Sequence, residues 1–384
     1  MIRLVLLVVA LGPALVGCAS VRLPEWHHTV IFIGDRSSVE DSDTSIVTPV
    51  DFSPEPTPSG RWVVRTPPVS TGRFDGFDEA LIAWNIDLEP GAAATIDVIV
   101  DPGSLHAPPD ALRVGFAGDH RCLPPGDRVL STDDGTVRID VDYLRSGAPL
   151  RTIQVQVEFF PPKGVTAETP PGRVDRLSVC MSRTLLRRLC RTDEVIGPVR
   201  RTRSINLVPF RPQSTEDPVL SGRLCSPASL AMVLAFHGVD RRVGDLAAMV
   251  RDPDEDLYGN WPRNIQAAYE LGVPGFLTRF NSWEPVADHL SRGEPIIASI
   301  RAPRGVLRGA PYQQLTGGHL IVLTGLDGRG GVYVNDPAAG TALKGQRVYS
   351  MRDLTRAWME LANGTSYVLL KPSVSTPVSP RSKP

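Results

Sequence analysis

The stretch Gly222-Arg-Leu-Cys-Ser-Pro-Ala-Ser-Leu-Ala-Met-Val-Leu-Ala-Phe-His-Gly238 decides the fold of the second half of the chain. The first turn of a helix tolerates proline and glycine commonly ends a helix, so Pro227 and Gly238 bound a helix of about three turns. One face of this helix is apolar at helical spacing, formed by Leu230, Val233, Leu234 and His237. Cys225 therefore stands at the helix N-terminus.

The position of Cys225 has a chemical consequence. The positive end of a helix dipole stabilises a thiolate and lowers the pKa of a cysteine from its free value of about 8.5. Because the thiolate is the nucleophilic form, Cys225 is a candidate nucleophile. The alternative is a buried structural cysteine, which is common in proteins.

A nucleophilic thiolate needs a base, and the base needs a partner that orients it. Residues 316–325 predict a strand that carries His319 near its start, and residues 332–337 predict the return strand after a glycine-rich turn. Asp336 lies at the matching end of the return strand, 336 − 319 = 17 positions after His319. A hairpin of that length brings its two ends into register, so the carboxylate can accept a hydrogen bond from the imidazole.

Four blocks of the second half occur in order at suitable spacing. They are Cys225-Ser-Pro-Ala-Ser-Leu-Ala-Met-Val-Leu-Ala-Phe-His-Gly238, Gly259-Asn-Trp-Pro262, Gly317-Gly-His319 and Val334-Asn-Asp-Pro337. Together they resemble the cysteine peptidase family 39-like domains, which are papain-like relatives of bacteriocin leader peptidases. The resemblance covers about residues 205–372 and implies a C-terminal α+β papain-like fold. It implies Cys225 as nucleophile, His319 as base and then acid, and Asp336 as the carboxylate that orients His319.

The same resemblance implies an oxyanion-hole glutamine upstream of the cysteine. Val208-Pro-Phe-Arg-Pro-Gln213 resembles the block that carries it, which makes Gln213 the candidate donor beside the backbone N–H of Cys225. The spacing of 225 − 213 = 12 is longer than in bacteriocin leader peptidases. Ser226 also stands where many relatives have glycine. The alternative for Gln213 is a surface loop residue.

Other residues of this half are better explained by structure than by chemistry. Asn260-Trp-Pro262 predicts the start of a helix that runs to Leu271 and stops at Gly272. We expect Trp261 and Trp283 to pack, and we expect Tyr312-Gln-Gln314, just before His319, to be placed to contact a substrate backbone. The histidines show no HExxH or cysteine-rich pattern, so we expect no metal and no other cofactor.

The N-terminus predicts a targeting segment. Arg3, the apolar run Leu4–Leu11 and a small-residue region form the order of a signal peptide too short to span a bilayer. Leu15-Val-Gly-Cys18 resembles the bacterial lipobox, in which the signal, here residues 1–17, is removed and the cysteine is acylated. This implies a lipoprotein anchored through Cys18 on the periplasmic or extracellular face of a membrane. The alternative is an ordinary secretory signal with a chance cysteine.

The first half predicts a β-domain. Residues 18–60 read as a tether, and residues 61–200 as an antiparallel β-sandwich whose short strands are separated by Pro- and Gly-rich turns. The predicted strands are Arg61–Arg65, Ala80–Leu88, Ala94–Val100, Leu112–Ala117, Thr136–Tyr143, Ile153–Phe160 and Arg176–Met181. Residues 373–384 read as a disordered tail.

Two features of this β-domain leave alternatives open. Trp62 and Trp84 could form a sugar-binding face, although Trp84 lies inside an apolar run and is expected in the core. In an oxidising compartment Cys122, Cys180 and Cys190 could form one disulfide. We favour Cys122 with Cys180, because both fall in the strand-rich half, but sequence does not determine the pairing.

Charge and composition bound the partners. The chain carries 41 Lys and Arg against 42 Asp and Glu, a formal net charge of −1, so no overall basic field exists to hold nucleic acid. We therefore expect an exported, lipid-anchored cysteine peptidase that hydrolyses a peptide or amide bond, with a peptide or cell-envelope substrate. An acyltransferase or amidase with the same triad is the first alternative. A non-catalytic lipoprotein that binds glycan or protein is the second.

Overall fold

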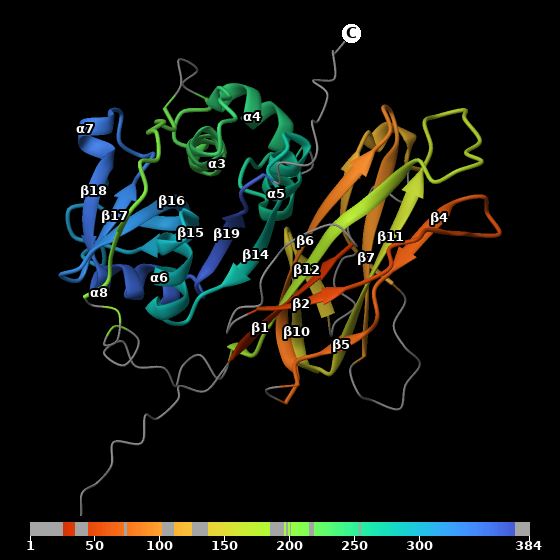
Figure 1. The fold of residues 1–384 in the computed structure, drawn as a ribbon, viewed down its shortest axis with the longest axis horizontal. Helices are drawn as coiled ribbons and strands as arrows, with labels where there is room; N and C mark the ends of the chain where they lie inside the picture. The colour runs from red at the N-terminus through yellow and green to blue at the C-terminus, as the bar shows by residue number, and fades with distance from the viewer. Residues whose placement is uncertain are drawn as a thin grey trace, which may run out of the picture.

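The computed structural model describes residues 26–34, 45–72, 75–101, 111–124, 137–184, 196, 199, 201–214, 219–252 and 255–372. The predicted signal segment 1–17, the lipid site Cys18, Cys190 and the tail 373–384 lie outside the described residues. Two bodies lie side by side (Figure 1): strands of the first half form one, and a third sheet with helices forms the other. Among the described helices, none combines the length and the apolar content needed to cross a membrane.

The first half forms two sheets that share one core. The first sheet has the order β2-β1-β12-β6-β10-β9, and the second has the order β3-β4-β11-β7-β8 with β5 also paired to β11. Their facing sides bury a single apolar cluster that includes Trp84. The first sheet consists of β1 (His27–Ile33), β2 (Ser45–Pro49), β6 (Phe77–Leu88), β9 (Val137–Asp140), β10 (Tyr143–Leu150) and β12 (Gly172–Ser182). The second consists of β3 (Glu55–Pro56), β4 (Trp62–Arg65), β5 (Val69–Ser70), β7 (Ala93–Asp101), β8 (Leu112–Gly118) and β11 (Thr152–Phe160).

Alternation along the sequence explains these strands. In β11 the apolar side chains Ile153, Val155 and Val157 are buried, while the polar residues between them are partly exposed. Every strand segment predicted between residues 61 and 181 contains a strand, although Thr136–Tyr143 is interrupted at Val141 and Asp142, where β9 turns into β10. Val141 occupies the left-handed region at that turn, with φ of 58°.

The predicted tether is wrong for residues 26–34 and 45–56. Strand β1 is buried over its whole length and pairs with β12 from His27 opposite Ser182 to Ile33 opposite Arg176. Its apolar run Val30–Ile33 has partners on both faces of the sheet, which explains why it folds into the domain. Strand β2 then pairs with β1 in parallel, so this sheet is not wholly antiparallel.

The favoured disulfide between Cys122 and Cys180 is also wrong. Cys180 on β12 is buried in a cluster that includes the second half of the chain, whereas its neighbours Val179 and Met181 face the core between the two sheets. Cys122 follows β8 of the other sheet, in the 3-10 turn η1 (His120–Cys122), and its Sγ donates to the Asp119 carbonyl at 2.9 Å. The two thiols thus belong to different sheets, and no bond joins them.

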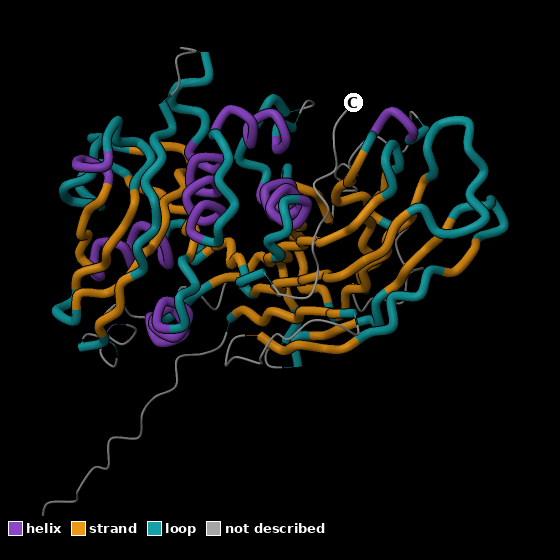
Figure 2. The backbone as a smooth tube through the Cα atoms, turned by 45° about the horizontal axis from the view of Figure 1, so that its top comes forward, coloured by secondary structure: helices purple, strands orange, loops and turns teal. Residues whose placement is uncertain are grey.

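The second half is built on a third sheet with the order β14-β19-β15-β16-β17-β18, and β13 also pairs with β16. Helix α3 packs against β16 on one face, beside α4 and α5, and α6 lies on the other (Figure 2). The strands are β13 (Arg203–Ile205), β14 (Gly275–Arg279), β15 (Ile296–Ala302), β16 (Leu315–Asp327), β17 (Gly331–Asn335), β18 (Gln346–Ser350) and β19 (Thr365–Leu369). The helices are α3 (Cys225–Phe236), α4 (Val243–Val250), α5 (Trp261–Glu270), α6 (Trp283–Ser291), α7 (Ala342–Gly345), α8 (Met351–Leu354) and the π-helix η3 (Thr355–Glu360).

The two halves meet across a buried interface. Leu81 and Ala83 of β6 lie in the same apolar cluster as α3. The side chain of Gln266 on α5 bonds both the backbone N–H and the backbone carbonyl of Ile86, at 3.0 and 2.8 Å. The first sheet therefore contacts the helix layer that surrounds the candidate site.

Candidate active site

Helix α3 positions Cys225 at its first residue. The sequence predicted one buried face, but Ser226–Leu234 is buried continuously because α3 lies between the sheet and the other helices. Such a helix cannot shift without disturbing its whole surroundings. Its N-terminus therefore holds the half-buried Cys225 at a fixed place, with the positive end of the helix dipole toward the thiol.

A polar network anchors the residue after the nucleophile. The Ser226 hydroxyl donates to Asn264 Oδ1 at 2.9 Å and lies 2.8 Å from the hydroxyl of Tyr367. Asn264 in turn donates to the backbone carbonyls of Tyr258 and Asn260. All these contacts are buried. Ser226, which departs from the family pattern, is therefore held in place by side chains of α5 and β19. Nothing in the sequence pattern indicated this network.

The hairpin of β16 and β17 brings His319 and Asp336 together. Val322 lies opposite Asn335, so Asp336 follows the end of β17 beside the part of β16 that carries His319. His319 Nε2 lies 2.8 Å from Asp336 Oδ1, and both residues are buried. Nε2 bonded to the carboxylate leaves Nδ1 for Cys225, whose thiol also hydrogen-bonds the imidazole.

The three groups shift one another's pKa values. Burial raises the pKa of Cys225, but the hydrogen bond and charge of His319 and the backbone N–H groups of Leu320 and Ser226 outweigh it and lower the pKa. Burial lowers the pKa of His319, but Asp336 and Cys225 outweigh it and raise the pKa to about 10. Burial raises the pKa of Asp336, and the hydrogen bond to His319 outweighs it and lowers the pKa. These directions favour a thiolate–imidazolium pair oriented by an ionised carboxylate.

Two tyrosines that the sequence did not indicate for this role border the His319–Asp336 pair. The Tyr349 hydroxyl donates to Asp336 Oδ2 at 2.8 Å. The ring of Tyr312 packs edge-on against the imidazole of His319, with ring centres 5.4 Å apart. Tyr312, which we expected to contact a substrate backbone, lies beside the imidazole of His319.

The segment that carries Gln213 runs beside the same hairpin. Asn335 Nδ2 donates to the Val208 carbonyl at 3.0 Å, and the Gln213 N–H donates to the Pro337 carbonyl at 2.8 Å. Gln213 is half-buried, and its Oε1 atom is buried without a hydrogen-bond partner among the described residues. The structure therefore brings the Gln213 backbone to the turn that follows Asp336.

Other residues singled out in the sequence lie outside this arrangement. Trp283 is buried and its indole N–H donates to Thr355 Oγ1 at 2.7 Å, which confirms packing. Trp261 stacks on Tyr143 of the first sheet. Asn260 accepts a hydrogen bond from the Arg263 N–H and so caps α5, as predicted. In the part of the chain that the structure describes, no group of three or more His, Cys, Asp or Glu side chains is arranged to hold a metal ion.

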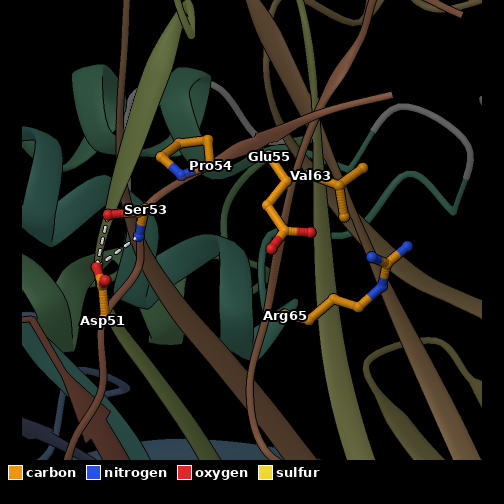
Figure 3. Close-up of a pocket in the computed structure, with 6 residues that line it drawn as sticks. All are labelled: Asp51, Ser53, Pro54, Glu55, Val63 and Arg65. Carbon is orange, nitrogen blue, oxygen red and sulfur yellow. Dashed lines mark hydrogen bonds between the residues drawn. The ribbon is translucent and has the colours of Figure 1, made fainter. Parts of the chain in front are cut away.

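A hollow in the first half lies away from these residues. Figure 3 shows it on the β3 and β4 edge of the second sheet, lined by Asp51, Ser53, Pro54, Glu55, Val63 and Arg65. Asp51 accepts hydrogen bonds from the backbone N–H and the hydroxyl of Ser53. Trp84 is buried in the core, as expected, so it cannot contribute to a sugar-binding face. The hollow contains none of the candidate catalytic residues.

Comparison with known proteins finds a family match in the second half. Residues 205–366 match the model of the Peptidase_C39 like family, in agreement with the predicted C39-like domain. No curated protein matches the chain.

Three solved structures are similar to this chain over less than half of its length. A double glycine motif protease from an AMS/PCAT transporter, solved with the leader peptide, is 22% identical, with coverage of 45% of this chain and 96% of its own, at a TM-score of 0.31. A C39-like peptidase from Bacillus anthracis is 20% identical, with coverage of 44% and 98%, at a TM-score of 0.35. The peptidase domain of Streptococcus ComA is 16% identical, with coverage of 43% and 100%, at a TM-score of 0.30.

Proposed function

We propose that this chain, whose residues 205–366 form a C39-like cysteine peptidase domain, is an exported, lipid-anchored enzyme that hydrolyses peptide or amide bonds through Cys225, His319 and Asp336. One observation carries the proposal. His319 Nε2 lies 2.8 Å from Asp336 Oδ1, and the interaction of the same imidazole with Cys225 lowers the pKa of the thiol at the N-terminus of α3. A nucleophile, a base and a group that orients the base are thereby connected.

The chemistry proceeds in two halves. The Cys225 thiolate attacks the carbonyl carbon and forms a C–S bond, and the carbonyl electrons move to the oxygen. The C–N bond then breaks as the His319 imidazolium gives its proton to the leaving amine. Water then attacks the thioester carbon while neutral His319 takes a proton from the water. The C–S bond breaks, the carboxylic acid product leaves, and the thiolate–imidazolium pair is regenerated.

The negative oxygen of each tetrahedral intermediate needs donors. The backbone N–H of Cys225 and the side-chain amide of Gln213 are the proposed pair. Two observations support Gln213: its segment is bonded to Pro337, and its Oε1 atom forms no hydrogen bond among the described residues that would fix the amide elsewhere. Loss of one such donor costs about a hundredfold or more in kcat in other acyl-transfer enzymes.

The test of the proposed nucleophile needs no known substrate. We expect iodoacetamide to alkylate Cys225 at neutral pH faster than a free thiol, measured by mass spectrometry, because His319 lowers the pKa of the thiol. His319→Ala should remove this advantage, whereas the control His237→Ala should keep it, since His237 lies at the far end of α3. If Cys225 is alkylated no faster than a free thiol, and His319→Ala does not change that rate, the proposed enzymatic function is refuted.

The reaction type is tested next. Soluble protein beginning after residue 18 is incubated with a peptide library and with peptidoglycan fragments, with Cys225→Ala as the control. Cleaved peptides support the proposal. New bonds between an acyl group and an added amine would point to acyl transfer, cleavage of peptidoglycan amides alone to an amidase, and retention of either material without cleavage to a binder.

The anchor is a separate part of the proposal. Leu15-Val-Gly-Cys18 after an apolar run supports acylation of Cys18, and two or more acyl chains give stable membrane attachment. The two sheets of the first half would then serve as an accessory β-sandwich next to the catalytic domain. Radiolabelled palmitate should enter the wild-type protein and be lost in Cys18→Ser. Absence of label in the wild-type protein would remove the anchor but leave the enzyme.

A further inference from the structure

Asp336 is a buried carboxylate whose hydrogen bonds are divided between two oxygens. The residue is fully buried, so each charged oxygen needs a donor within the protein. Oδ1 accepts from His319 Nε2 at 2.8 Å and from the Ala338 N–H at 3.1 Å. Oδ2 accepts from the Tyr349 hydroxyl at 2.8 Å. Tyr349 therefore supplies a donor to the oxygen that does not face the imidazole.

The fold fixes Tyr349 in this position. It lies on β18 opposite Val332 of β17 and is 1% exposed, whereas the preceding Val348 points outward and is 53% exposed. The ring is part of the apolar cluster on the side of the sheet that carries α6 and η3. Its hydroxyl remains a donor, because burial and the charge of Asp336 raise the pKa of Tyr349 well above its ordinary range. An ionised carboxylate can only accept, so the direction of this hydrogen bond is determined.

A second tyrosine, Tyr312, borders the same pair. Its ring lies edge-on to the imidazole of His319, and its hydroxyl is buried and interacts with Asp336. Burial first, and then the charge of Asp336, raise the pKa of Tyr312. Two tyrosine side chains thus border the His319–Asp336 contact, which strengthens the electrostatic interaction between the two residues.

We propose that Tyr349 is a positioning residue for the triad: its hydroxyl holds the Asp336 carboxylate by Oδ2 so that Oδ1 faces His319. The inference rests on the proposed function, because it assigns a role to Tyr349 through the triad. Without the donor, the Asp336 carboxylate is held less firmly toward His319, and the imidazolium is held less firmly toward Cys225. The pKa of the Cys225 thiol, which His319 lowers, therefore rises.

The experiment measures the rate of Cys225 alkylation by iodoacetamide against pH in the full chain, by mass spectrometry. Tyr349→Phe keeps the ring and removes the donor, and it should move the acid limb of the profile to higher pH by about one pH unit. At a pH below that limb, Cys225 in Tyr349→Phe should therefore be alkylated about tenfold more slowly than in the wild type at the same pH. Tyr333→Phe is the matched control: Tyr333 lies on the adjacent strand β17 and is only partly buried, and its profile should equal that of the wild type. A merely structural role of Tyr349 would lower the melting temperature without moving this limb.

A second variant keeps the proposal testable if Tyr349→Phe does not fold. A ring-fluorinated tyrosine placed at position 349 by codon suppression keeps the shape and is a stronger donor, so the acid limb should move to lower pH. An unchanged limb in either folded variant overturns the role of Tyr349 while fast wild-type alkylation keeps the enzyme. A wild-type Cys225 no more reactive than a free thiol overturns both.

Discussion

In the proposed mechanism, the reactivity of Cys225 depends on the charge of the neighbouring His319 imidazole. The thiol loses its proton below its ordinary pKa, and the pKa of His319 lies near 10, so the thiolate and the imidazolium coexist between these two limits. We expect kcat/KM for a cleaved peptide to rise as Cys225 deprotonates and to fall again near pH 10, as His319 loses the proton that the leaving amine needs. Stopped assays across this range measure the profile.

The alkylation rate of the same protein provides the control for this profile. Alkylation needs the thiolate but no proton donor, so it should stay high above pH 10 where peptide cleavage declines. If both rates followed one titration with the inflection of a free thiol, the ion pair would be refuted.

At the scale of single residues, the sequence indicated the candidate nucleophile and base but not the residues that hold them in place. Cys225 and His319 were visible because a helix start and a glycine-flanked strand are local patterns. Tyr349 was not, because its contact with Asp336 depends on the pairing of β17 with β18 and on which face of β18 points inward. Ser226 was noted only as a departure from the family, since its partners Asn264 and Tyr367 come from other elements.

The turn between β9 and β10 connects the first half to helix α5. Asp142 in this turn accepts a hydrogen bond from the Trp261 N–H at 3.1 Å, at the start of α5. Burial raises the pKa of Asp142 to about 7, although the Trp261 N–H lowers it, and the charge of Asp140 raises it further. The folded chain therefore holds a proton at this site that the unfolded chain releases near pH 3.8.

This gives a pH dependence with a defined sign. The contribution of Asp142 to stability is full below about pH 3.8 and declines as pH rises to about 7, because only the folded state binds the proton in this window. Asp142→Asn keeps an acceptor for Trp261 and removes the charge. Its melting temperature relative to wild type should therefore rise from pH 4 to pH 7 and then level off. A constant difference between Asp142→Asn and wild type across this range would contradict the prediction.

At the scale of elements, local periodicity predicted most strands and helices, and distant pairing explains the failures. The period-two pattern of β11 and the Pro and Gly signals around α3 and α5 depend on a few neighbouring residues. Strand β1 has an apolar run, but its assignment as a strand depends on β12, about 150 positions later. The parallel pairing of β1 with β2 has no signal in either segment.

For the whole molecule, the decisive feature is the interface between the two halves, which sequence could not predict because it depends on two folded surfaces. Asn85 accepts a hydrogen bond from the Gly275 N–H at 3.1 Å, and the hydroxyls of Thr29 and Thr278 lie 2.8 Å apart. Each residue belongs to a strand that pairs with strands of its own half. Only their complementarity makes the two halves one packed unit.

A buried ion pair tests this unity. Glu79 of β6 and Arg279 of β14 approach to 2.8 Å, with side chains only 7% and 2% exposed. Glu79→Gln leaves the guanidinium buried without its counter-charge, and loss of one partner of a buried pair costs about 3–5 kcal/mol. The matched control Glu158→Gln removes a partner of Arg61 within the first half, where the pair is more exposed and the expected loss is about 1 kcal/mol or less.

The free-energy cost of leaving the Arg279 charge unpaired can be separated from the net contribution of the Glu79–Arg279 pair to stability. A double variant, Glu79→Gln with Arg279→Met, removes the stranded charge, so it should recover much of the stability lost in Glu79→Gln. Urea unfolding followed by tryptophan fluorescence gives the free energies, and the wild type should unfold in one transition because the interface couples the halves. Two transitions in the wild type would mean that the halves are stable independently. A loss of stability in Glu79→Gln no larger than in Glu158→Gln would mean that the sheets of the first half do not stabilise the C39-like domain.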